Sequence, residues 1–218
     1  MYIASFDIGK KNFAFCVEKI NTESLQHIKK IPIRKRYNKD GTATKEFQDV
    51  LSKFYNCGQV VLIAVLDLTQ DCNSKLYLDP HTFINMTNTL DKYQKYWDKC
   101  SAFIIEKQMS FRNKYNTMAL KLGQHCYSYF IIKYQNTKQI IEYPAYHKTQ
   151  ILGAKKIDVK QKPKRKKWAI VKALDILNQR KDTHTIKGFE SCKKKDDMAD
   201  CLLMTITFAF QKWIDKKF

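Results

Sequence analysis

Four acidic residues of the chain stand where a carboxylate would be costly without a charged partner. Asp7 lies near the end of an apolar run at residues 2–8, and Glu106 ends another such run. A carboxylate inside an apolar strand costs several kcal/mol unless a charged group pairs with it. Asp197 and Asp200 are three residues apart, which places them on one face of a helix about one turn apart.

Carboxylates that converge on one point repel one another, and a divalent cation removes that repulsion. An all-oxygen ligand set suits Mg²⁺ or Mn²⁺. Two such ions about 3.5–4 Å apart can activate a water and stabilise the leaving oxygen of a phosphodiester. The four acids therefore predict a nuclease site with two metal ions, whose product carries a 5′-phosphate and a 3′-hydroxyl.

Each acid also has a plainer interpretation when it is taken alone. Asp7 could cap a turn before Gly9, and Glu106 could pair with Lys107 or Arg112 at a strand end. Asp197 could be the N-cap or a first-turn acid of the final helix, which the helix dipole favours. The metal site is favoured because all four acids occur together and at the ends of predicted elements.

The charge of the chain indicates the kind of partner. The chain has 218 residues, of which 44% are hydrophobic, and a net charge of +19. The hydrophobic content is enough to form a core. A net charge this positive indicates a polyanionic partner. The sequence shows no apolar run of transmembrane length and no amphipathic membrane anchor. We expect nucleic acid as the partner and no membrane.

The cysteines and glycines exclude two further classes of protein. Seven cysteines are scattered without a CxxC pair, which disfavours a zinc ribbon. Met1 leads almost directly into an apolar run with no room for a cleaved presequence, so we expect free thiols in a reducing intracellular compartment. The chain has no GxxxxGK[ST] phosphate loop, so we expect no nucleotide cofactor.

The hydrophobic pattern predicts an α/β fold. Apolar runs predict five strands, at residues 2–8, 13–17, 59–68, 102–106 and 139–143. Periodic apolar residues predict helices at residues 82–99 and 113–133, after Trp168, and at 197–214. This order fits one domain, residues 1–218, with a mixed sheet flanked by helices. Residues 29–57 are charged and weakly periodic, which suggests an inserted or extended basic segment or a mobile arm.

Basic residues follow the predicted strands and precede the last helices. A run between residues 155 and 167 would bind phosphates without reading sequence; its members are Lys155, Lys156, Lys160, Lys162, Lys164, Arg165, Lys166 and Lys167. Trp168 could stack on unpaired bases or pack in the core. A second set borders the acids and could place a phosphate over the metals: Lys10, Lys11, Lys107, Arg112 and Lys114.

Three segments together resemble the RuvC group of Holliday junction resolvases, most closely the enzymes of poxviruses and other large DNA viruses. The segments are SFDIGKKNFAFCV at 5–17, AFIIEKQ at 102–108 and KKDDMADCLLM at 194–204. The resemblance implies a ribonuclease H-like fold with a mixed five-stranded sheet. It also implies that Asp7, Glu106, Asp197 and Asp200 match the metal-binding acids.

The resemblance carries further implications. Lys167 is the best match to a lysine in the first turn of the preceding helix, with Lys166 as a rival, and it would stabilise charge on the scissile phosphate. The resemblance implies a homodimer that resolves four-way DNA junctions by paired symmetric nicks, at a viral replication site in the host cytoplasm. It does not extend over residues 29–57. Two alternatives stay open: a ribonuclease H-type hybrid nuclease and a non-catalytic protein that binds branched DNA.

Overall fold

The computed structural model describes residues 1–73, 75–108 and 116–218. It contains one five-stranded sheet in the order β3-β2-β1-β4-β5. The strands are β1 (Tyr2–Asp7), β2 (Phe13–Ile20), β3 (Gly58–Leu66), β4 (Cys100–Lys107) and β5 (Gln139–Pro144). The first three strands are antiparallel neighbours, and β4 and β5 run parallel to β1. The predicted mixed sheet is therefore confirmed.

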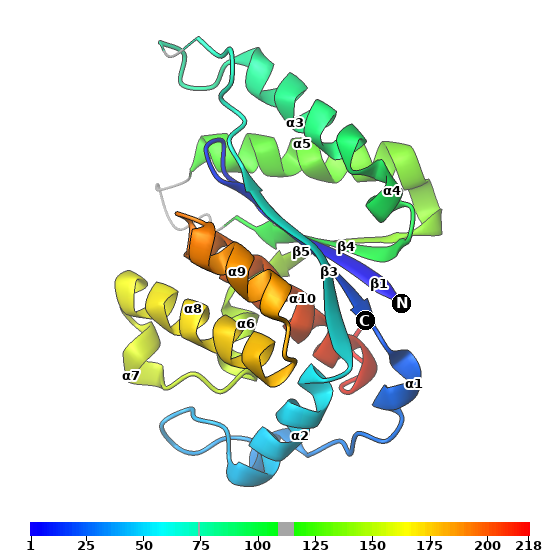
Figure 1. The fold of residues 1–218 in the computed structure, drawn as a ribbon, viewed down its shortest axis with the longest axis vertical. Helices are drawn as coiled ribbons and strands as arrows, with labels where there is room; N and C mark the ends of the chain where they lie inside the picture. Colours follow the sequence, from blue (N-terminus) through cyan, green and yellow to red (C-terminus); the bar gives the residue numbers. More distant parts are fainter. Residues whose placement is uncertain (74, 109–115) are drawn as a thin grey trace.

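Helices cover both faces of the sheet (Figure 1). The helices are α1 (Thr22–Leu25), α2 (Lys45–Tyr55), α3 (Pro80–Lys92), α4 (Gln94–Trp97), α5 (Thr117–Tyr134), α6 (Tyr146–Ile151), α7 (Lys156–Val159), α8 (Lys162–Gln179), α9 (Thr183–Ser191) and α10 (Lys195–Trp213), with short 3-10 turns η1 (Ile33–Lys35) and η2 (Gln135–Thr137). Helices α3, α4 and α5 lie on one face, and α6, α8, α9 and α10 lie on the other (Figure 1).

The strands are continuous apolar runs because both faces of the sheet are buried. In β1, Ile3 packs into the core on the α10 side, whereas Ala4 and Phe6 pack into the core on the α5 side. On the α5 side an aromatic cluster fills the core, where the ring of Phe130 stacks on Phe103 at a centroid distance of 4.0 Å. The cores on the two faces hold the ends of β1 and β4 in a rigid frame.

Helix α10 is the central helix of its face, and nearly all of its residues after the first turn are buried. Hydrogen bonds to Ser5 fix the position of α10 along β1. The Ser5 hydroxyl donates to the carbonyl of Cys201 at 2.8 Å, and the Thr205 hydroxyl donates to Ser5 at 2.7 Å. The N-terminal end of α10, with its acids, is therefore held against the end of β1.

The segment at residues 29–57 packs against the core and is not a free arm. Phe47 and Phe54 of α2 meet the ring of Phe210 edge-on, at centroid distances of 5.7 Å and 5.2 Å. Arg36 donates two hydrogen bonds to the Asp215 carboxylate, and both side chains are buried. The sequence interpretation missed α2, although apolar residues at helical spacing mark its buried face.

Other boundaries also differ from the predicted ones. The predicted helix at 82–99 is two helices, α3 and α4, which meet at Tyr93. Helix α8 begins at Lys162, six residues before Trp168, so most of the basic run is helical. Within residues 1–73, 75–108 and 116–218, no helix combines the length and apolarity needed to cross a membrane.

Candidate active site

Asp7 and Glu106 lie side by side where two parallel strands end. Phe6 of β1 pairs with Ile105 of β4, so the residues that follow them share one edge of the sheet. Their carboxyl groups are within hydrogen-bonding reach of each other. The pKa of Asp7 is raised well above its usual value, first by burial and then by the charges of Glu106 and Asp200.

Asp200 approaches the same edge of the sheet from α10. Its pKa is raised, chiefly by burial, although the neighbouring ammonium of Lys148 lowers it. The structure thus brings Asp7, Glu106 and Asp200 together from three elements. The pKa values of Asp7 and Asp200 are raised because burial and the neighbouring negative charges both oppose ionisation of these carboxyl groups.

Lys148 stands among these carboxylates and was not among the residues that the sequence indicated. It lies on α6, is only 4% exposed, and places its Nζ 2.9 Å from Asp200 Oδ1 and 3.7 Å from Glu106 Oε1. Burial lowers the pKa of this lysine, but the charges of Asp200, Glu106 and Asp7 outweigh burial and raise it. Lys148 is therefore a cation at neutral pH.

A signal for Lys148 does exist in the sequence. The strand β5 runs parallel to β4, so the segment after β5 begins at the same sheet edge as Glu106. Lys148 comes four residues after Pro144, the last residue of β5. A lysine at this point differs from the surface lysines of the basic run because its backbone position already faces the edge that carries the acids.

Asp197 and Asp196 flank the cluster in the first turn of α10. Burial and the charge of Asp196 raise the pKa of Asp197 to about 6. Asp196 forms an ion pair with Lys166 of α8, and this hydrogen bond is the main cause of the raised pKa of Lys166. Asp197 thus lies beside Asp200 without a hydrogen-bonded cation of its own among the residues that the structure describes.

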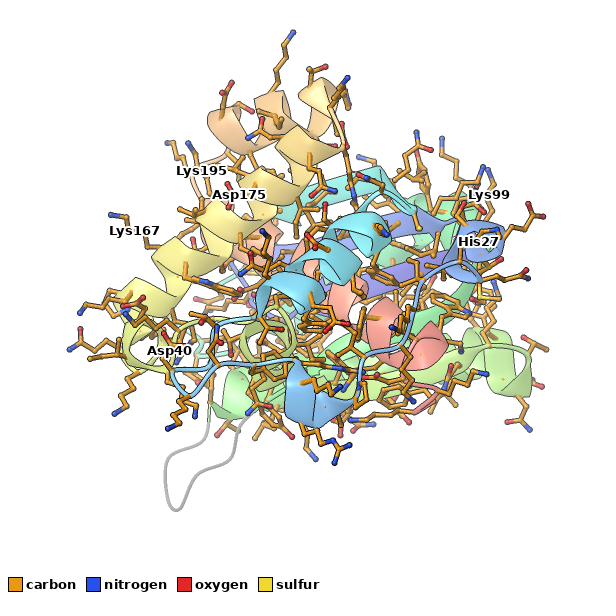
Figure 2. All side chains as sticks on the ribbon, turned by 90° about the horizontal axis from the view of Figure 1, so that it is seen from below. His27, Asp40, Lys99, Lys167, Asp175 and Lys195 are labelled. Atoms are coloured by element: carbon orange, nitrogen blue, oxygen red, sulfur yellow. The ribbon has the colours of Figure 1, made fainter. Side chains whose placement is uncertain are left out.

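The lysine that faces these acids is Lys166 and not Lys167, contrary to the preference drawn from the sequence. Figure 2 shows Lys167 extending outward from α8, and its side chain is exposed. Successive residues of an α-helix point about 100° apart, so only one of two neighbouring lysines can face α10. The sequence alone could not choose between them because the rotation of α8 depends on its packing.

The site's donors suit a hard divalent cation, although its carboxylates are not arranged as a formed metal site. In the described part of the chain, no three His, Cys, Asp or Glu side chains surround a common point. The ammonium of Lys148 lies between Glu106 and Asp200 instead. The acids supply only oxygen ligands, and one buried ammonium does not cancel their repulsion, so the residues fit Mg²⁺ or Mn²⁺.

The predicted phosphate-binding residues differ in their exposure and in their partners. Lys11 and Lys107 are exposed, whereas Lys10 donates to the carbonyl of Tyr77 at 2.8 Å. Arg112 and Lys114 lie outside the described residues. The basic run is exposed along α7 and α8 at Lys155, Lys156, Lys160, Lys162, Lys164 and Arg165. Trp168 packs against the core, in line with the second of its two interpretations.

This fold is that of the RuvC-like resolvases, in agreement with the sequence resemblance. The fowlpox virus resolvase in complex with substrate Holliday junction DNA matches with a TM-score of 0.54 and 16% identity, over 95% of this chain and 96% of that chain. Thermus thermophilus RuvC matches with a TM-score of 0.52 and 14% identity, over 97% and 95%. The yeast mitochondrial Holliday junction resolvase Ydc2 matches with a TM-score of 0.52 and 15% identity, over 99% and 86%.

The sequence itself has relatives among iridescent viruses. Protein 170L of Invertebrate iridescent virus 6 is 34% identical over 239 residues, which cover 98% of this chain and 89% of that protein. Protein 97L of Invertebrate iridescent virus 3 is 34% identical over 209 residues, which cover 93% and 96%. No family model matches the chain. The chain belongs to this family of iridescent virus proteins, and this member of it has the RuvC-like fold.

Proposed function

We propose that this protein is a metal-dependent endonuclease that resolves four-way DNA junctions by paired nicks. The observation that carries the proposal is the gathering of Asp7, Glu106 and Asp200 around Lys148 at one edge of a RuvC-like sheet. Buried carboxylates that repel one another are destabilising for the fold. Their presence is best explained by a cation that joins them when the protein works.

The residues divide the work as follows. Asp7, Glu106 and Asp200 would hold the ions, with Asp197 as a further ligand in the first turn of α10. When bound, Mg²⁺ or Mn²⁺ supplies an activated water and stabilises the leaving oxygen. Lys148 holds the acids in place and offers its remaining N–H donors to a phosphate oxygen. Hydrogen bonds from a fixed ammonium stabilise negative charge that develops on that oxygen.

The basic surface supports a nucleic acid as substrate. The exposed lysines of α7 and the first turns of α8 lie on the side of the molecule that carries Lys166, the partner of Asp196. Such residues give an affinity that depends on salt and not on base sequence. The fowlpox virus resolvase, which shares the fold, was solved with Holliday junction DNA, and this favours branched DNA over other polyanions.

A homodimer would match the symmetry of that substrate. A four-way junction has approximate two-fold symmetry and needs two nicks, which a pair of subunits related by a two-fold axis can supply. Each subunit would then contribute one complete acid cluster. Sedimentation of the protein with and without junction DNA tests this part of the proposal independently of cleavage.

The decisive experiment compares cleavage of a four-way junction with cleavage of an RNA–DNA hybrid, with Mg²⁺ and with EDTA. We expect the wild-type protein to nick only the junction and only with the metal. Asp7→Asn and Asp197→Asn should bind the junction but not cut it, because each loses a ligand charge while keeping its shape. Cleavage of the hybrid alone would identify the RNA–DNA hybrid as the substrate in place of the junction. Binding of the junction without any cleavage would indicate a non-catalytic binding protein.

A further inference from the structure

A pocket lies on the side of α6 that faces away from the acid cluster. Its volume is about 630 Å³, and Gln150 of α6 lines it. Gln150 follows Lys148 by two residues, so on an α-helix their side chains point about 200° apart. The helix that carries the active-site lysine on one side therefore carries this pocket on the other.

Hydrogen bonds between two distant segments build the pocket wall. The backbone N–H of Lys156 donates to the carbonyl of Asp40 at 2.8 Å, and its Nζ donates to the carbonyl of Lys39 at 3.1 Å. The Tyr37 hydroxyl donates to the carbonyl of Ile151 at 3.2 Å. The turn around Asp40, labelled in Figure 2, is thereby fixed to the start of the basic run.

Two glycines allow this close approach. Gly41 and Gly153 both have positive φ angles, of 94° and 71°. A Cβ at Gly41 would lie 2.9 Å from Cγ of Lys156, and a Cβ at Gly153 would lie 2.6 Å from the backbone N of Ala43. Because larger residues would separate the two walls, the pocket depends on both glycines and is not an accidental gap between loops.

The lining of the pocket combines apolar surface, positive charge and side-chain amides. Ala154, Val159 and the half-buried ring of Tyr37 form its apolar part. Lys156 and Lys160 are exposed and supply positive charge at its edge. Phosphates of an intact duplex would use these lysines but would leave the apolar part in contact with water.

Two side-chain amides complete the lining, and they point to a base as the ligand. Asn38 and Gln150 are exposed residues of this pocket. Asn38 Nδ2 donates to Thr42 Oγ1 at 3.0 Å and leaves its amide oxygen to accept, whereas the Gln150 amide can both donate to and accept from the edge of a base. Within residues 1–73, 75–108 and 116–218, the backbone carbonyl of Gln150 accepts from the N–H of Gly153 at 3.4 Å, and its exposed side-chain amide is left for a ligand. A nucleotide has an apolar ring, polar edges and a phosphate, so it matches all three chemistries.

We propose that this pocket binds one unpaired nucleotide of the branched DNA, with its base against Val159 and its phosphate near Lys156 and Lys160. This inference rests on the proposed function, since opening of a base pair at the branch point of a junction supplies the unpaired nucleotide. One helix diameter, ~10–12 Å, separates the two sides of α6. An unstacked strand spans more than the ~3.4 Å per nucleotide of a duplex, so three nucleotides are enough to join the bound base to the phosphate at the acids.

The test measures binding in EDTA, so that it does not depend on cleavage. Val159→Trp fills the pocket and Gln150→Ala removes its free amide, while Val171→Trp adds the same ring at an exposed point of α8 as a control. The probes are a fluorescein-labelled oligothymidylate and a linear duplex of equal length. We expect both pocket variants to weaken oligothymidylate binding by about tenfold, in line with the effect of losing one base contact, and to leave duplex binding unchanged.

A second measurement places the base directly. A 2-aminopurine within three nucleotides of the branch of a four-way junction should change its emission on binding to the wild-type protein and to Val171→Trp, but not on binding to Val159→Trp. Equal losses of affinity for the single strand and the duplex, or no loss of oligothymidylate affinity in Gln150→Ala, would overturn the pocket assignment. Failure of cleavage with intact pocket binding would instead count against the nuclease.

Discussion

Two groups of buried charges lie at opposite ends of the β1–β2 hairpin, and they are balanced differently. Glu18 of β2, fully buried, pairs with Arg180 at 2.5 Å, so one carboxylate meets one guanidinium. At the other end Asp7 and its two neighbouring carboxylates share Lys148. Both groups sit in the same framework of strands, and the comparison shows which buried charges serve the fold and which leave an excess for chemistry.

The Glu18 pair has the features of a structural contact. Arg180 caps the end of α8 and also donates from Nε to the carbonyl of Tyr55 at 2.6 Å, so it joins α8, α2 and β2. A Cβ at Gly58 would lie 2.3 Å from the Glu18 carboxylate, so this glycine leaves room for the pair. The charges are matched one to one, and no unbalanced carboxylate is left for a metal ion.

The largest expected effect comes from breaking the matched pair. Arg180→Ala leaves Glu18 buried without its partner, and we expect the free energy of unfolding to fall by about 3–5 kcal/mol. Urea unfolding measures this loss. The double variant Glu18→Leu with Arg180→Met should recover most of it, because an apolar pair removes the uncompensated charge. A small loss in Arg180→Ala alone would contradict the structural role.

Changing the cation of the unbalanced group should affect chemistry more than folding. Lys148→Met should lower the single-turnover rate of junction cleavage by about 10²-fold, the usual effect of losing one fixed donor at a reacting oxygen. Saturating Mg²⁺ should keep the variant folded, since the metal replaces the missing positive charge. The rate with Lys148→Arg, which keeps the charge, should lie between those of the wild type and Lys148→Met. An unchanged rate in Lys148→Met would remove this lysine from the site.

The two neighbouring lysines of α8 offer a matched pair of variants. Lys166→Met removes the partner of Asp196, and we expect cleavage to fall about tenfold because a cation beside the acids is lost. Lys167→Met removes an exposed lysine one residue away and should reduce DNA binding slightly, with a smaller dependence of affinity on salt. A larger cleavage defect in Lys167→Met would restore the assignment that the sequence favoured.

The smallest effect concerns the pH dependence of stability in EDTA. The pKa of Asp197 is about 6 in the folded protein against a usual value of 3.8, so the folded state holds its proton more tightly than the unfolded state does. Its contribution to stability therefore falls as pH rises from about 4 to about 6. Over this range the free energy of unfolding of Asp197→Asn should rise relative to that of the wild type. We expect a difference of about 1 kcal/mol, because partial exposure of the group to solvent reduces the effect.

Urea unfolding at several pH values measures this difference. Adding Mg²⁺ should reduce the advantage of Asp197→Asn, because the ion stabilises the ionised carboxylate in the wild type. A constant difference across the pH range would show that neither burial nor the charge of Asp196 raises the pKa of Asp197.

Much of the fold could be predicted from the sequence because its signals are local. Strands buried on both faces are continuous apolar runs, and the structure has a strand at each of the five predicted places. The helix α2 and the packing of residues 29–57 were harder to predict. Phe47 and Phe54 are buried only because Phe210, far along the chain, provides the surface on which they pack.

The acids themselves were determined by the sequence, since Asp7 and Glu106 end apolar runs and Asp197 and Asp200 have the spacing of one helical turn. The identity of their cationic neighbours was decided by the tertiary structure. Lys148 faces the acids because β5 lies parallel to β4, and Lys166 pairs with Asp196 beside them because the packing of α8 fixes its rotation. Sequence spacing places a residue on an element, but only packing orients that element toward its neighbours.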